Sequence, residues 1–210
     1  MPLRLALACV TWLTVAGRPS LAAGVLLCFC GLLRSAEMLS LRGRAVVRTM
    51  NGYVLLLGDT KRGQEQTVLI QECSIVAWLD GFLARHRLRS ADYLVPVGYT
   101  TFARWLTKAC EGLGMSHVHW TTHSLRRGGA TALMRAGCSW PALLHYGRWA
   151  SARSAKEYVR RGEVALIELE EKSAPAVWAR LTALAAVGPW IWHPSLGFAK
   201  PRKEVRGTYP

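Results

Sequence analysis

The hydrophobic pattern of this chain of 210 residues changes its period twice, which limits the folds open to it. Up to residue 41 and again from residue 74, apolar residues recur at the spacing of helices. Between these parts, three short β-rich runs (45–47, 53–57 and 66–70) are bounded by Asn51-Gly52 and by a second glycine-containing turn. Such runs with tight turns predict a three-stranded antiparallel meander. The sequence therefore predicts an α+β fold, mainly α-helical, with one small sheet.

Helices are predicted on both sides of that sheet. They cover residues 3–16, 20–33, 35–41, 75–83, 100–113, 121–135, a short stretch from Trp140, 154–161, and 163–186 with a break at Pro175. The first two are apolar all round and are expected to be buried. No linker divides the chain, so we expect one domain over residues 1–187. A basic tail of residues 188–210, rich in proline and glycine, is expected to be disordered.

The charge is strongly positive and unevenly distributed. The chain has 27 Lys and Arg against 13 Asp and Glu, a net charge of +14, which favours a polyanionic partner such as nucleic acid or an anionic membrane. Between His123 and Arg161, the only acid is Glu157. The basic residues there are Arg126, Arg127, Arg135, Arg148, Arg153, Lys156, Arg160 and Arg161. This local concentration favours nucleic acid over the membrane surface.

The N-terminus permits two interpretations. An apolar run up to Gly17, followed by Ser20-Leu21-Ala22, is similar to a secretory signal peptide, but a pair of buried helices explains it equally well. The next apolar run, 21–33, has 13 residues, whereas a membrane-spanning helix needs about 20. We expect an intracellular protein with no membrane span, and secretion is the competing interpretation.

Neither cysteines nor histidines form a convincing metal motif. The six cysteines include no CxxC pair and lie mostly in apolar stretches, as reduced thiols do. His117 and His119 have the spacing of a ligand pair but lack a third ligand at a usable distance. We expect no metal and no small-molecule cofactor.

His123 and Arg126 are spaced to project from one face of a helix. Arginine neutralises a phosphate with a planar fork of donors, and histidine can accept a proton. Tyr158 could supply a nucleophilic oxygen, so the three together would make a phosphoryl-transfer site. Taken alone, the HxxR spacing is more typical of a solvated arginine face with a capping histidine.

From about Leu21 to Glu171, the order of motifs resembles the catalytic domain of the tyrosine recombinase (phage integrase) family. The stretch Gly31-Leu32-Leu33-Arg34-Ser35-Ala36-Glu37-Met38-Leu39 is similar to the start of the family's arginine helix. The other matching positions are Lys61 in the hairpin, His123-Ser124-Leu125-Arg126 as the HxLR box, Trp149 at the late histidine-or-tryptophan position and Tyr158 as the nucleophile, nine residues beyond Trp149.

The resemblance implies cleavage and rejoining of DNA through a covalent 3′-phosphotyrosyl intermediate. In this reaction Tyr158 attacks a backbone phosphate, His123 accepts its proton and Lys61 protonates the leaving 5′ oxygen. The charge on the phosphate would be neutralised by Arg34 and Arg126, with an N–H donated by Trp149 and with Glu37 orienting Arg34. The further residues expected to bind DNA are Arg62, Arg127 and Arg148.

The resemblance also implies partners and leaves alternatives open. Family members usually carry a separate N-terminal helical domain that closes around DNA, and only 33 residues precede Arg34 here, so we expect that domain to be absent or truncated. We expect double-stranded DNA as partner, a homo-oligomer on DNA with segment 164–184 packed into a neighbouring protomer, and a location in the nucleus or nucleoid. A mobile element is the expected origin. The alternatives are a catalytically impaired DNA-binding relic and a type IB topoisomerase.

Overall fold

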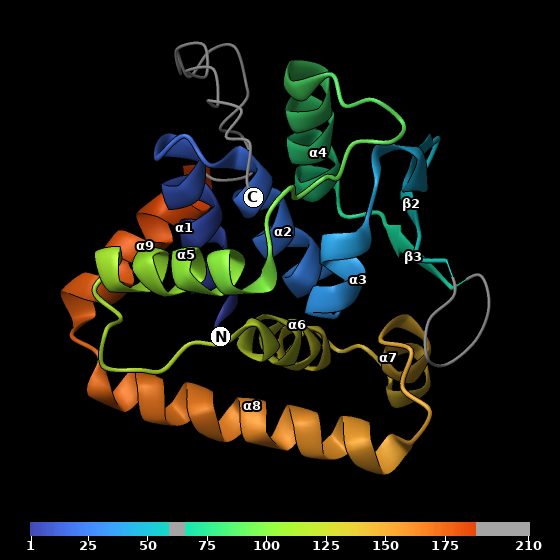
Figure 1. Cartoon of the computed structure of the whole chain (residues 1–210). Coiled ribbons are helices and arrows are strands. Elements are labelled where there is room, and N and C mark those ends of the chain that lie inside the picture. Colours follow the sequence, from blue (N-terminus) through green and yellow to red (C-terminus); the bar gives the residue numbers. More distant parts are fainter. Residues whose placement is uncertain (59–65, 188–210) are drawn as a thin grey trace.

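The computed structural model describes residues 1–58 and 66–187, which form helices around one small sheet (Figure 1). The helices are α1 Leu3–Val15, α2 Pro19–Cys30, α3 Ser35–Ser40, the 3-10 turn η1 Gly43–Ala45, α4 Cys73–His86, α5 Tyr99–Gly112, α6 Thr122–Arg135, α7 Trp140–Tyr146, α8 Ala152–Lys172 and α9 Pro175–Val187. The strands are β1 Val46–Thr49, β2 Gly52–Leu56 and β3 Thr67–Ile70. The predicted fold class is confirmed.

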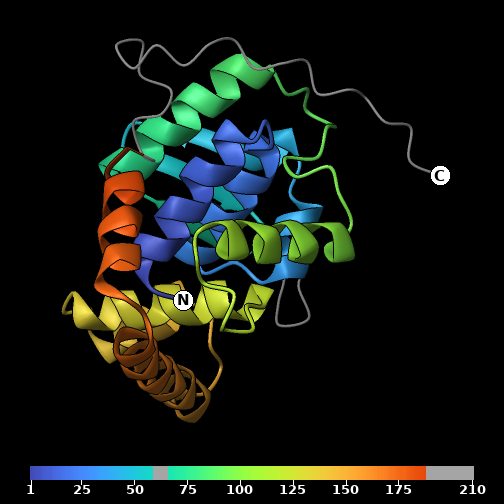
Figure 2. The same cartoon turned by 90° about the vertical axis from the view of Figure 1, so that its left-hand side faces the viewer.

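Helices α1 and α2 form the centre of the molecule, as the two views show (Figures 1 and 2). Every residue of α2 from Pro19 to Phe29 is buried, because the segment has no polar face to turn toward water. Proline suits the first position of this helix, where its missing N–H would have no partner within the helix. The N-terminal apolar residues thus lie in the protein core. Within residues 1–58 and 66–187, no helix is both long and apolar enough to cross a membrane.

The sheet has the order β1-β2-β3, with both neighbouring pairs antiparallel. Thr49 pairs with Gly52, which leaves a turn of two residues between β1 and β2. Gly52 has a φ of +134°, and a Cβ there would lie 2.0 Å from the carbonyl oxygen of Ile70, so this position requires glycine. Lys61 and Arg62, which were predicted in the turn between the second and third strands, belong to residues 59–65 and lie outside the described residues, as does the predicted basic tail 188–210.

The C-terminal helices differ from the prediction at one point. Separate helices over 154–161 and 163–186 were expected, but α8 continues through Gly162 to Lys172. Gly162 lies inside the helix at the place where α8 touches α6, and a Cβ there would lie 2.0 Å from Thr131 Oγ1. The predicted break at Pro175 is confirmed, since α9 begins there. Helix α8 therefore packs across α6 as one continuous helix.

Gly129 allows α6 to approach the end of α2 closely. A Cβ at this position would lie 2.0 Å from the carbonyl oxygen of Phe29, a backbone atom that cannot rotate away. Overpacking of this kind costs about 1–3 kcal/mol, and alanine regains up to about 1 kcal/mol through its helix propensity. We therefore expect Gly129→Ala to lower the free energy of unfolding by about 1–2 kcal/mol in chemical denaturation.

Gly98→Ala is the control for this substitution. Gly98 precedes α5 with a φ of −77°, and nothing lies within 4 Å of a Cβ built there. Gly98 is the N-cap of α5, where alanine is disfavoured, so its replacement should lower the free energy of unfolding by no more than about 0.5–1 kcal/mol, without any clash. Equal losses in the two variants would contradict the close approach of α6 to α2.

Candidate active site

The site is formed by four segments that are far apart in the sequence. Arg34 and Glu37 come from the start of α3, and His123 and Arg126 from the first two turns of α6. Trp149 follows α7, and Tyr158 lies in the second turn of α8. In Figure 1 these segments meet below α3, where α6, α7 and α8 come together. The folded chain thus brings together all the described residues to which the sequence assigned a catalytic role.

The hydroxyl group of Tyr158 lies 3.1 Å from Nδ1 of His123. A capping box fixes the first turn of α6, because Ser124 Oγ accepts a hydrogen bond from the backbone N–H of Thr121 at 3.2 Å. His123 on this turn is exposed, and Tyr158 is half-buried. The ring of Trp149 meets that of Tyr158 edge to face, with centroids 5.8 Å apart. The nucleophile and the base assigned from the sequence are therefore in direct contact, at a place that solvent reaches.

Arg126 is a buried cation with backbone partners, only 4% exposed. Its guanidinium donates to the carbonyl oxygens of Leu32 and Gly147 and lies 4.6 Å from the centre of the Trp149 ring. Burial, together with the nearby charges of Arg34 and Arg148, lowers its pKa to about 10. Arg126 therefore stays protonated at neutral pH and is fixed in place before any ligand arrives.

Glu37 joins two of the site's arginines. Its Oε1 lies 2.5 Å from Nη1 of Arg34, and its Oε2 lies 2.8 Å from Nη2 of Arg148. The backbone N–H of Arg34 also donates to Oε2, at 2.8 Å. The side chain of Glu37 is 8% exposed, so this ion pair is largely shielded from water. The Arg34 side chain is one-third exposed. Glu37 therefore holds this guanidinium at a place that a ligand can reach.

The charge balance of the site favours an anion. Among the described residues, Arg34, Arg126 and Arg148 lie around one carboxylate, that of Glu37, and the charges of Arg34 and Arg148 act on the buried Arg126. Within this described group, three cations face one anion, which leaves positive charge unpaired in a partly buried site. A phosphate group would complete this arrangement, since guanidinium groups bind phosphate oxygens through paired hydrogen bonds.

Tyr158 keeps its proton in the unliganded site. Burial raises its pKa, and the opposing influence of Arg126, Arg127 and Arg34 is too weak to reverse the shift. Nucleophilic attack by this oxygen therefore requires a base to take the proton, and the adjacent Nδ1 of His123 is placed to do so.

The residues predicted to contact DNA fall in different environments. Arg127 is half-buried, and its guanidinium carbon lies 5.4 Å from the centre of the Tyr158 ring. Its Nε is buried and has no hydrogen-bond partner within the described part of the chain. Only 7% of the Arg148 side chain is exposed, and its guanidinium is paired with Glu37. Arg62 and the predicted acid Lys61 lie outside the described residues.

A hollow of about 420 Å³ lies beside the site and reaches the sheet. It is lined by Gln66, Thr67, Leu144, His145, Arg148, Trp149 and Ala150. Thr67 is the first residue of β3, and Gln66 immediately precedes it. The strand that follows the predicted lysine turn therefore begins next to Trp149.

No grouping of three or more His, Cys, Asp or Glu residues suited to a metal occurs among residues 1–58 and 66–187. His117, one member of the pair singled out in the sequence, has its Nε2 at 3.3 Å from Ser173 Oγ.

Because of Glu37, the free energy of unfolding is expected to vary with pH in the acid range. Burial tends to raise its pKa, but the Arg34 N–H, the charge of Arg148 and the Arg34 side chain outweigh burial and lower it below the usual 4.5. A carboxyl group whose pKa is depressed by folding stabilises the fold above its unfolded pKa and loses that contribution as the pH falls through the folded value. We expect the free energy of unfolding to decrease progressively as the pH falls below about 4.5.

Urea denaturation over a range of pH measures the share that Glu37 contributes. Glu37→Gln should be less stable than the wild type at neutral pH, and the difference should shrink as the pH falls below about 4.5. Glu163→Gln, at an exposed position of α8, is the control and should track the wild type. A difference that stays constant with pH would show that the charge of Glu37 does not stabilise the fold.

Several partners in the site are backbone atoms that no sequence motif indicates. The carbonyl oxygen of Leu32 accepts hydrogen bonds from both Arg126 and Arg148, and that of Gly147 accepts one from Arg126. Leu32 and Arg148 have φ values of +48° and +54°, in the left-handed region that side chains disfavour. The run Gly31-Leu32-Leu33 shows only that the chain turns between α2 and α3, so the role of Leu32 was not foreseen.

Comparison with known proteins places these features in a family. Residues 14–163 match the model of the phage integrase family. No curated protein sequence matches the chain significantly.

Two solved structures share the fold. The crystal structure of XerA recombinase is similar with a TM-score of 0.63 at 19% identity, over 81% of this chain and 62% of that one. The XerH site-specific recombinase, bound to a palindromic difH substrate in a post-cleavage complex, is similar with a TM-score of 0.60 at 15% identity, over 81% of this chain and 51% of that one. The chain thus spans less than two thirds of the length of either neighbour.

Proposed function

The chain belongs to the phage integrase family, and we propose that residues 1–187 are a tyrosine recombinase catalytic domain that cleaves and rejoins double-stranded DNA. The observation that carries the proposal is the 3.1 Å contact between the Tyr158 hydroxyl and His123 Nδ1, next to the buried Arg126. Two further facts support DNA as the partner: the net charge of +14, and the DNA substrate bound to the similar XerH recombinase.

In the proposed reaction, the Tyr158 oxygen attacks a backbone phosphate and forms a P–O bond while the P–O5′ bond breaks. Nδ1 of His123 accepts the tyrosine proton, which requires the neutral imidazole with its hydrogen on Nε2. The departing 5′ oxygen takes up a proton, for which we propose Lys61, the lysine implied by the family resemblance. One phosphodiester replaces another. The 3′-phosphotyrosyl link can therefore be attacked by a 5′ hydroxyl, which rejoins the strand and releases Tyr158.

The arginines would stabilise the charge that gathers on the non-bridging phosphate oxygens. Arg126 is fixed by two backbone carbonyls and Arg34 by Glu37, so neither has to be reorganised when the phosphate arrives. Preorganised donors of this kind are effective in a partly buried site. Trp149, which lies against both Arg126 and Tyr158, would contribute its indole N–H.

We also propose that the active form is a homo-oligomer assembled on DNA, inside the cell. The origin in a mobile element stays a prediction, as does packing of the C-terminal helix into a neighbour. In the single chain, α9 packs on α1, where Thr11 Oγ1 donates to the carbonyl oxygen of Leu184 at 2.8 Å.

A suicide substrate tests the proposal. The full chain is incubated with a set of duplexes, each nicked at a different position. Cleavage close to a nick releases a short fragment, which diffuses away and prevents rejoining. We expect a protein–DNA adduct that survives SDS, with Tyr158 as the modified residue in peptide mapping. Binding of duplex DNA without any adduct would support the catalytically impaired relic instead, and absence of binding would contradict both.

A further inference from the structure

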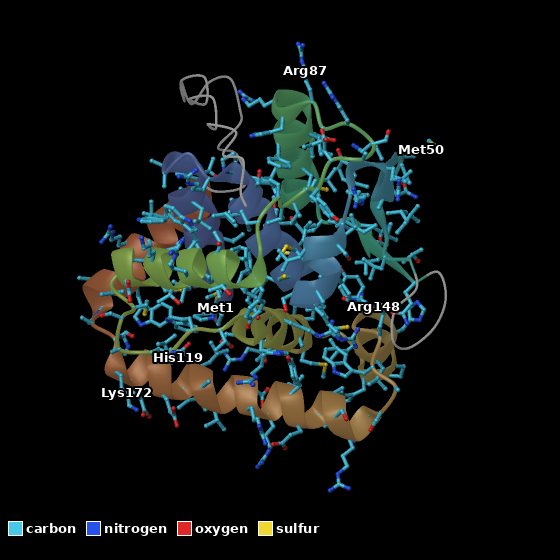
Figure 3. All side chains as sticks on the ribbon, viewed as in Figure 1. Met1, Met50, Arg87, His119, Arg148 and Lys172 are labelled. Carbon is cyan, nitrogen blue, oxygen red and sulfur yellow. The ribbon has the colours of Figure 1, made fainter. Side chains whose placement is uncertain are left out.

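Arg148 has a largely buried side chain on a strained backbone. Both terminal nitrogens of its guanidinium are hydrogen-bonded, and its Nε has no hydrogen-bond partner within the described part of the chain. Its φ of +54° lies in the left-handed region, where a Cβ is crowded by the neighbouring carbonyl. The side chain is only 7% exposed and turns inward, between α7 and α3 (Figure 3). Residues persist in such a conformation only where their surroundings hold them, and such positions cluster at functional sites.

Arg148 shares two hydrogen-bond acceptors, the Glu37 carboxylate and the Leu32 carbonyl, with the other arginines of the site. Its Nη2 lies 2.8 Å from Glu37 Oε2 and 3.2 Å from the carbonyl oxygen of Leu32. Glu37 also holds Arg34, and the Leu32 carbonyl also holds Arg126. Arg148 is therefore the link between the two arginines that would bind the phosphate.

The third partner of Arg148 fixes the end of α7. Its Nη1 donates to the carbonyl oxygen of Tyr146 at 3.3 Å, and Trp149 follows directly in the chain. Arg148 thus connects the loop that carries Trp149 to the α2–α3 turn that carries Leu32. None of these contacts directs its guanidinium outward to a ligand.

We propose that Arg148 is a positioning residue, which sets the relative placement of Arg34 and Arg126 through Glu37 and the carbonyl of Leu32. The inference rests on the proposed strand-cleavage function for its kinetic part only. It replaces the role assigned to Arg148 from its charge, a direct contact with DNA. A positioning residue alters the rate of the chemical step at saturating DNA, whereas a phosphate contact alters the affinity and its salt dependence.

Arg148→Gly is the informative substitution, because glycine accepts a positive φ, so the side chain and its guanidinium are removed without straining the backbone. Arg87→Gly is its matched control: Arg87 also has a positive φ, +43°, but it is exposed at the end of α4, far from the site (Figure 3). Both changes relax the backbone and remove one positive charge. Only Arg148→Gly should disturb the site.

The first measurement needs no cleavage. Side-chain NMR of the unliganded protein, with Arg34 and Arg126 assigned from their lysine variants, should show shifted or exchange-broadened guanidinium signals for both residues in Arg148→Gly. Arg87→Gly should leave these signals unchanged. Unchanged signals in Arg148→Gly would overturn the proposal, whether or not the protein cleaves DNA.

The second measurement is single-turnover cleavage of the nicked duplex at saturating DNA. We expect Arg148→Gly to lower the rate by roughly 10- to 100-fold, as the loss of a supporting hydrogen-bond partner does at other sites. The dissociation constant for the duplex and the slope of its salt dependence should change less than those of a variant lacking a phosphate contact, which loses about one unit of slope. Weaker binding with a smaller slope and an unchanged rate would overturn the proposal.

A double substitution shows whether Arg148 affects the cleavage rate through Glu37 or independently of it. If Arg148 acts through this carboxylate, Arg148→Gly combined with Glu37→Gln should be little slower than the slower single variant, since coupled residues are not additive. Independent effects would multiply the two rate losses and contradict the proposal. Arg148→Lys, which keeps the charge beside Glu37 but cannot bridge both acceptors, serves the same measurements if Arg148→Gly fails to fold.

A wild-type chain that binds duplex DNA but forms no adduct would count against the proposed function alone. The NMR comparison of Arg148→Gly and Arg87→Gly would still decide the placement of Arg34 and Arg126.

Discussion

Tyr158→Phe is expected to abolish the covalent protein–DNA adduct while leaving the protein folded and able to bind the duplex. The substitution removes only the oxygen that would bond to phosphorus. The ring would keep its edge-to-face contact with Trp149 and its place beside Arg127. The lost hydrogen bond to His123 is partly exposed, so the stability should fall by no more than about 0.5–1.5 kcal/mol.

Tyr93→Phe is a matched control for this result. Its hydroxyl also has one side-chain partner, Arg42, at 2.6 Å, but it lies on an exposed loop after α4. SDS gel analysis of the suicide-substrate reaction should show adduct formation at the wild-type level for Tyr93→Phe and none for Tyr158→Phe. An adduct that persists in Tyr158→Phe would disprove the assignment of the nucleophile.

Arg126→Lys is expected to affect both the reaction and the fold. The guanidinium donates to the carbonyls of Leu32 and Gly147 with two different nitrogens, which a single ammonium group on a flexible stem cannot reproduce. The Leu32 carbonyl keeps its hydrogen bond from Arg148, so the carbonyl at risk is that of Gly147, and leaving it without a partner costs about 1–3 kcal/mol of stability. Loss of one preorganised donor to a developing oxyanion slows comparable reactions by roughly 10²- to 10³-fold. The rate of adduct formation should therefore fall by roughly 10²- to 10³-fold, even at temperatures where the variant is fully folded.

Denaturant unfolding and single-turnover cleavage measure the two effects separately. Arg180→Lys, at an exposed position of α9, makes the same chemical change and should alter neither quantity measurably. Wild-type cleavage by Arg126→Lys would refute the role proposed for the guanidinium. A loss of stability without loss of rate would reduce Arg126 to a structural residue.

The fold could largely be predicted because local patterns and burial agree. Helix α2 is apolar all round and proves to be central, and the three β-rich runs form the sheet in the expected order. The exception is the helix boundary predicted near Gly162. A glycine ends a helix or permits close packing, and only the position of Thr131 on α6 shows that the second applies.

The candidate site was predicted as a set of residue types, not as an arrangement. The spacing of His123 and Arg126 indicates a shared face, but the contact with Tyr158 depends on how α8 crosses α6. The sequence also assigned Arg148 to DNA on account of its charge. Its burial against Glu37 follows from a backbone conformation that neighbouring residues in the chain do not determine.

The acceptor on which Arg126 and Arg148 converge is the carbonyl oxygen of Leu32. A main-chain oxygen is supplied by every amino acid, so alanine scanning cannot delete it. A change of side chain at position 32 would therefore keep the acceptor, although the new residue must tolerate a φ near +48° and fill the buried apolar space that Leu32 shares with Leu143 and Val159. An inventory of functional side chains would overlook this position. Replacement of the Leu33 amide by an ester, which weakens the Leu32 carbonyl as an acceptor, would probe it directly.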